Sequence, residues 1–146
     1  FKTEEFINNI NDEEPPTKEI YHFTSDSGLY SILKNNKIHG NNDQYAVSLT
    51  SDESYGGNGF LPYESTVGVL VLDAKRLGKD YTLERYVYDK DEDAEYDDYV
   101  NEHEWVIKGE LNNVTDYILF IGDNGLQEGT VADIKKDFPN LKIEKW

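Results

Sequence analysis

The chain has 146 residues, 37% of them hydrophobic and 13% aromatic, which predicts one folded domain with a core of its own. Its 30 acidic and 14 basic residues give a formal net charge of −16 at pH 7, and such a field disfavours binding to nucleic acid phosphates. The chain has no cysteine, which excludes disulfides and cysteine-ligated zinc; this fits a reducing cytosol, and we expect a cytoplasmic protein.

The acidic residues are concentrated in one segment. Residues 89–104 hold nine acidic residues and one lysine, a net charge of −8, which is half of the total. Two interpretations remain open: an acidic surface that keeps a small domain soluble, or a segment that presents carboxylates to a basic partner. No apolar run approaches the roughly 18 residues of a membrane span, and we therefore expect no membrane partner.

The N-terminal part of the chain differs from the rest. Residues 1–19 are acidic, and the helical spacing of Phe6 and Ile10 predicts a short helix or an arm. Pro15 and Pro16 then interrupt that pattern, as a linker would. We expect residues 20–146 to form a single domain.

The rest of the chain reads as short strands with few helices. A helix should follow a cap at Thr24, Ser25 or Asp26 and end near Asn35. The expected strands lie at 20–23, 45–50, 66–72, 81–88, 104–107, 116–121 and 141–146, with a glycine-rich loop at 51–62, a helical turn at 73–77 and an amphipathic helix at 130–138. This order predicts an α+β domain built on an antiparallel sheet.

Three polar segments lie at the edges of expected strands: residues 21–25 (YHFTS), residues 48–51 (SLTS) and residues 102–105 (EHEW). Strand alternation would place Glu102 and Glu104 on one side and His103 on the other. Two carboxylates on one side suit the binding of hydroxyl groups or the movement of protons. Each segment taken alone is also typical of an ordinary turn or a solvated strand edge.

In this order, the segments YHFTS, with the following GLYSILKNNKI, then VSLTS, then EHEWVIKGELNNVTDYILFI, resemble the ADP-ribosyltransferase superfamily. The resemblance is to its small bacterial and phage-type members and spans about residues 20–121. It implies a split antiparallel sheet core that binds NAD as a substrate. It also implies transfer of ADP-ribose to a macromolecular acceptor, which the charge suggests is a protein.

The resemblance also implies roles for particular residues. His22 would hold the ribose on the nicotinamide side or the amide, assisted by Thr24 or Ser25. Glu104 would be catalytic and stabilise the oxocarbenium-like state, while Glu102 would orient the acceptor nucleophile. The pocket for nicotinamide would be shaped by Ser48, Thr50 and Ser51.

The sequence departs from this family at the phosphate contacts. The chain has two arginines, Arg76 and Arg85, and neither adjoins the first motif. Phosphates would need Lys34, Lys37, Arg85 or backbone amides. The alternative is therefore a non-catalytic acidic binding or inhibitor protein that keeps the fold, for example a DNA mimic or an anti-defence factor.

The acidic segment also contains a candidate calcium-binding loop. Asp89, Asp91 and Asp93 have the spacing that begins an EF-hand loop. Ala94 stands where that loop needs glycine, and Val100 stands where it needs glutamate. We therefore expect no metal site.

Overall fold

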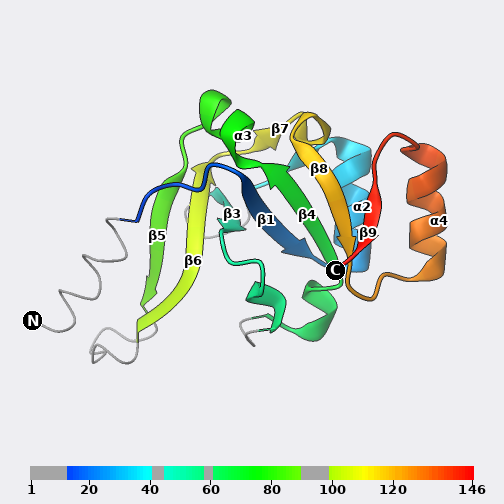
Figure 1. Cartoon of the computed structure of the whole chain (residues 1–146), viewed down its shortest axis with the longest axis horizontal. Helices are drawn as coiled ribbons and strands as arrows, with labels where there is room; N and C mark the ends of the chain where they lie inside the picture. Colours follow the sequence, from blue (N-terminus) through cyan, green and yellow to red (C-terminus); the bar gives the residue numbers. More distant parts are fainter. Residues whose placement is uncertain (1–12, 41–44, 58–60, 90–98) are drawn as a thin grey trace, which may run out of the picture.

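The computed structural model describes residues 13–40, 45–57, 61–89 and 99–146 (Figure 1). Within these residues the chain forms a seven-stranded sheet, a separate two-stranded ladder and three α-helices. The sheet order is β5-β6-β3-β1-β4-β8-β9. The predicted α+β class is thus confirmed.

Along the chain, the strands are separated by short helices and 3₁₀ turns. The first part contains β1 (Glu19–Thr24), α2 (Asp26–Asn35), β2 (Lys37–Ile38), β3 (Ala46–Thr50) and the 3₁₀ turns Tyr55–Gly57 and Tyr63–Ser65. The second part contains β4 (Gly68–Asp73), α3 (Ala74–Asp80), β5 (Glu84–Asp89), β6 (Tyr99–Lys108), β7 (Leu111–Asn112), the 3₁₀ turn Val114–Asp116, β8 (Ile118–Asp123), α4 (Glu128–Asp137) and β9 (Ile143–Lys145).

The helix after β1 shows how the local sequence sets these boundaries. Ser25 is its N-cap, and the Ser25 hydroxyl accepts a hydrogen bond of 3.0 Å from the Gly28 N–H. Asn36 ends the helix in the left-handed conformation with a φ of 54°, which asparagine tolerates better than most residues. Leu29 and Leu33 face the core and are buried, as their spacing predicts.

The sheet opens between β1 and β3. β1 pairs with β4 along its whole length, from Glu19 opposite Asp73 to Thr24 opposite Gly68. Within the described residues, β1 and β3 share a single Cα pair, Tyr21 opposite Thr50. Beyond that pair the two strands have no ladder, so side chains and backbone groups from both are available to line a cavity.

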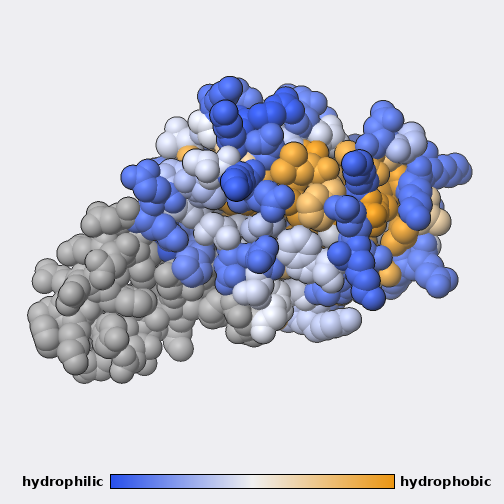
Figure 2. All heavy atoms as spheres, in the orientation of Figure 1, coloured by the Kyte–Doolittle hydropathy of each residue, from blue (hydrophilic) through white to orange (hydrophobic). Residues whose placement is uncertain are grey.

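Each face of the sheet carries an apolar cluster. The larger one lies under α2, α3 and α4 and includes Ile20, Leu70 and Leu72. The smaller one lies on the opposite face, where Tyr21, Phe23, Val69 and Val71 are covered by residues of the 51–65 loop and by Trp146. In the view of Figure 2 the surface is mainly hydrophilic, with an apolar patch over β4 and β8.

Several expected boundaries are wrong. α3 is a helix of seven residues where the sequence predicted a single turn at 73–77. β5 begins at Glu84, three residues later than predicted, and β6 begins at Tyr99, five residues earlier. β8 begins at Ile118 because Val114–Asp116 forms a 3₁₀ turn, and the short pair of β2 and β7 was not predicted.

Pairing in the sheet is antiparallel except between β8 and β9, which are parallel. Residues 1–12, with the predicted helix or arm around Phe6 and Ile10, lie outside the described residues. So do residues 90–98, which hold most of the acidic segment and of the candidate calcium loop. Among the helices of the described chain, none has the length and apolar character to cross a bilayer.

Candidate functional site

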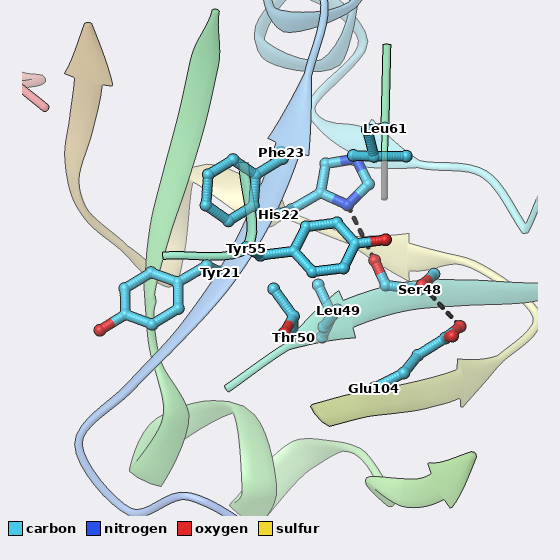
Figure 3. Close-up of a pocket in the computed structure, with 9 residues that line it drawn as sticks. All are labelled: Tyr21, His22, Phe23, Ser48, Leu49, Thr50, Tyr55, Leu61 and Glu104. Carbon is cyan, nitrogen blue, oxygen red and sulfur yellow. Dashed lines mark hydrogen bonds between the residues drawn. The ribbon is translucent and has the colours of Figure 1, made fainter. Parts of the chain in front are cut away.

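A cavity of about 150 Å³ lies where β1 and β3 diverge (Figure 3). Apart from the Tyr55 hydroxyl, its polar side-chain groups come from β1, β3 and β6, the strands that carry the three polar segments of the sequence. Its apolar walls come from β1, from β3 and from the 51–65 loop. The lining residues are Tyr21, His22, Phe23, Ser48, Leu49, Thr50, Tyr55, Leu61 and Glu104.

His22 bridges the opening between the two strands. Its Nδ1 lies 2.9 Å from the carbonyl oxygen of Ser48. A carbonyl oxygen only accepts, so Nδ1 carries the proton and, in the neutral ring, Nε2 is an acceptor. Burial lowers the pKa of His22, and the bond to the Ser48 carbonyl opposes this only in part. His22 therefore stays neutral to a lower pH than an ordinary histidine.

Glu104 is held by a hydroxyl group from the neighbouring strand. The Ser48 hydroxyl donates to Glu104 Oε2 at 2.7 Å, and Figure 3 shows this bond next to the His22 contact. The register explains the contact, because Thr50 lies opposite Glu104 and Ser48 lies opposite Val106. The bond fixes one carboxylate oxygen of Glu104 at the cavity wall.

Aromatic side chains form the other side of the cavity. The ring centroids of Phe23 and Tyr55 lie 5.6 Å apart with an interplanar angle of 47°. The loop that carries Tyr55 is tied to β3, since the Asp52 N–H donates to the Thr50 hydroxyl at 3.1 Å. Burial and the nearby Glu19 carboxylate raise the pKa of Tyr21, which keeps its hydroxyl protonated.

β6 is irregular immediately before Glu104. His103 has a φ of 50°, in the left-handed region, and the register of β5 and β6 shifts between Tyr86 and Tyr88. The Ser51 N–H donates to the His103 carbonyl at 3.0 Å, which ties this bulge to the end of β3. The alternation that the sequence assumed for residues 102–104 is therefore interrupted at His103. The side chain of Glu102 lies outside the described part of the chain.

Arg85 supports the strand that carries Glu104. Its side chain is 6% exposed and its guanidinium lies 5.5 Å from the centre of the Trp105 ring. Nη1 donates to the carbonyl oxygen of Glu104 at 2.6 Å, and Nε donates to the Glu13 carboxylate at 2.9 Å. Arg85 thus holds the backbone at Glu104 and does not line the cavity.

The structure brings together some of the residues that the sequence singled out. His22, Ser48, Thr50 and Glu104 line one cavity. Thr24, Ser25 and Ser51 do not line it. Ser25 caps α2, and the Ser51 side chain lies 3.4 Å from the His103 carbonyl oxygen.

Sequence reasoning missed the aromatic walls. Tyr21 and Phe23 flank His22 in the first motif, so their place beside the cavity follows once the sheet opens there. Tyr55 and Leu61 come from the glycine-rich loop, where no periodic pattern marks them. The described residues contain no group of three or more histidine, aspartate or glutamate side chains placed to hold a metal ion.

The chemistry of this cavity is that of one fixed carboxylate, one neutral imidazole and the hydroxyl groups of Ser48 and Thr50, beside aromatic rings of which two carry a phenol hydroxyl. Such a set can stabilise positive charge and bind the hydroxyl groups of a sugar or the atoms of an amide. Ser48 is not placed as an activated nucleophile, because His22 contacts its carbonyl and not its hydroxyl.

Comparison of the chain with models of known families, with curated proteins and with solved structures finds no match. The geometry of its own residues is therefore the basis on which its function has to be argued.

Proposed function

We propose that this protein is an NAD-dependent ADP-ribosyltransferase or a close relative, which transfers ADP-ribose from NAD to a macromolecular acceptor and releases nicotinamide. One observation carries the proposal: His22, Ser48 and Glu104, from three separate strands, line a single cavity where the sheet opens. These positions belong to the three segments that carry the resemblance to that superfamily.

The reaction breaks the bond between ribose C1′ and the nicotinamide nitrogen. The electron pair of that bond passes to the ring nitrogen, so nicotinamide leaves as a neutral molecule. Positive charge develops at C1′ and the ribose ring oxygen, and the Glu104 carboxylate stabilises it there. The acceptor then forms a bond to C1′ and releases its proton to the solvent.

The other residues position the reacting groups. The Ser48 hydroxyl holds Glu104 Oε2 in place, so the carboxylate needs little reorganisation when charge develops. His22 offers Nε2 as an acceptor for a ribose hydroxyl or the nicotinamide amide. Glu102 orients the acceptor nucleophile, which is the role that the resemblance implies for it. A group on a protein would supply this nucleophile.

The test is nicotinamide release from NAD by the intact protein and by its Glu104→Gln variant. We expect the variant to release nicotinamide roughly 10²- to 10³-fold more slowly, since an isosteric amide carries no charge to stabilise the transition state. Glu110→Gln is the matched control, because it removes one carboxylate from the turn between β6 and β7, where Glu110 pairs with Lys37. Equal rates from the protein and from Glu104→Gln would contradict the proposal.

A second candidate function is a binding protein that keeps the fold without the chemistry. Arg85, one of the residues expected to contact phosphate, is instead bound to Glu13 and buried. If a folded protein released no nicotinamide from NAD, and captured a basic partner only at low salt, this second function would be favoured.

A further inference from the structure

The charge of the cavity wall is negative. Among the described residues that line it, Glu104 is the one acidic residue and none is lysine or arginine, while burial holds the pKa of His22 below its ordinary value. Tyr21 stays protonated for the same reason and because of the nearby Glu19 carboxylate. A cation is therefore the charged group that this wall attracts.

The size and walls of the cavity suit one flat ring. A dry cavity of about this volume can hold a single six-membered ring. The aromatic side chains of Tyr21, Phe23 and Tyr55 border it, and aromatic faces attract organic cations. An aromatic cation fits both the shape and the charge of the cavity. Its ring would pack against the aromatic side chains, and its positive charge would be attracted to Glu104.

Phosphate groups find few partners near the cavity. Among the described residues, no lysine or arginine lines it. Arg85 is bound to Glu13, and Lys37 lies 3.6 Å from Glu110 at the β2 and β7 ladder. The segments outside the described residues add two lysines against ten acidic residues. A diphosphate would therefore approach a strongly acidic protein with little local compensation.

We infer that the group recognised at this site is an N-substituted aromatic cation, and that the phosphates of a dinucleotide add little to its binding. This rests on the proposed function and extends its substrate class from NAD to pyridinium nucleosides, such as nicotinamide riboside. The bond that breaks is the same, from ribose C1′ to the ring nitrogen. The electron pair goes to the ring nitrogen, and water or an acceptor group forms the new bond to C1′ and releases its proton to the solvent.

The first experiment compares ligands of matched shape by calorimetry with the full chain at about 0.15 M salt. 1-Methylnicotinamide is a cation, whereas nicotinamide is a neutral ring of nearly the same shape. We expect the cation to bind about tenfold more tightly. In Glu104→Gln this preference should fall to about the two- to threefold that the aromatic walls alone supply, while Glu110→Gln should keep it. Equal binding of the cation and the neutral ring by the unmodified protein would overturn the inference.

The second experiment measures what phosphate adds. We expect nicotinamide riboside and NAD to have dissociation constants within about threefold of each other, and both to release nicotinamide. NAD binding more than about tenfold tighter than the riboside would overturn the inference and leave the proposed function standing. Binding of the cation that depends on Glu104, with no release from either substrate, would instead contradict the proposed function.

Discussion

Ser48 serves the cavity through two different groups. Its hydroxyl donates to Glu104 and its carbonyl oxygen accepts from His22, so one residue of β3 connects the side chains of β1 and β6. The backbone contact fixes the His22 tautomer with the proton on Nδ1. The neutral form of His22 is therefore part of the folded arrangement, and its protonation should cost stability.

A pH dependence of stability follows from the lowered pKa of His22. The folded-state pKa lies below the ordinary value of 6.5, so the unfolded chain binds the proton more readily. The contribution of His22 is complete above about pH 6.5 and is lost as pH falls through the folded-state value. We expect the free energy of unfolding to fall more steeply from about pH 7.5 to about pH 5 than in His22→Gln, as measured by urea denaturation.

The other titrating groups contribute equally to the two pH profiles, because His39, His103 and the carboxylates occur in both proteins. The difference between the profiles therefore isolates the contribution of His22. Glutamine is a suitable replacement since its amide can still donate to the Ser48 carbonyl. Parallel pH profiles for the protein and the variant would show that His22 titrates as it does in the unfolded chain.

Among the elements, β6 carries the most irregular backbone of the site, and the segment before β1 supports it. Glu13 contacts both Arg85, at 2.9 Å, and His103 Nδ1, at 3.3 Å. Burial lowers the pKa of Arg85, and the Glu13 carboxylate opposes that change by stabilising the charged guanidinium. Since Arg85 also holds the Glu104 carbonyl, the residues before β1 stabilise the bulge beside the cavity.

Neutralising Glu13 should therefore destabilise the fold. Glu13→Gln leaves the buried Arg85 without its full counter-charge, and we expect the free energy of unfolding to fall by about 1–3 kcal/mol. This is less than for a fully buried ion pair, because Glu13 is partly exposed. Glu14→Gln removes the same charge from an exposed neighbour. In a chain of net charge −16 it should be neutral or slightly stabilising, because it relieves repulsion. Urea denaturation midpoints that shift alike for the two variants would contradict this account.

The sequence predicted elements well where pattern and capping agree. The helix after Ser25 and the apolar strand at 66–72 were found because local signals and burial point the same way. Sequence reasoning also singled out His22, Ser48, Thr50 and Glu104 among the lining residues, from polar groups at strand edges.

The remaining features depend on contacts distant in sequence. The bulge at His103 is supported by Ser51 and Glu13, and no pattern within residues 99–108 indicates either partner. The wall formed by Tyr55 depends on where a glycine-rich loop returns to the sheet. The bulge and the Tyr55 wall both depend on contacts between segments that are distant in sequence, whereas periodicity reflects only residues that are close in sequence.

At the scale of the whole molecule, the two faces of the sheet are closed by different means. Helices cover one face, whereas the aromatic cluster on the other is covered by a loop and by Trp146. The Trp146 ring lies 5.6 Å from that of Tyr21 and 6.1 Å from that of Phe23, and both of these residues also line the cavity. Packing of Trp146, the residue that follows β9, is thus continuous with the walls of the candidate site.

Gly122 on β8 makes this packing possible, because a side chain there would meet Trp146. A Cβ at Gly122 would lie 2.8 Å from Trp146 Cε3 and 3.1 Å from Val69 Cβ. We expect Gly122→Ala to lower the free energy of unfolding by about 1–3 kcal/mol through overpacking and to change tryptophan fluorescence as the Trp146 ring shifts.

Gly78→Ala is the control, since a Cβ at Gly78 in α3 meets nothing within 4 Å. Alanine should stabilise that helix by about 0.5–1 kcal/mol, so the two substitutions should shift the urea midpoint in opposite directions. A gain in stability from both would mean that Trp146 does not pack against Gly122 in solution.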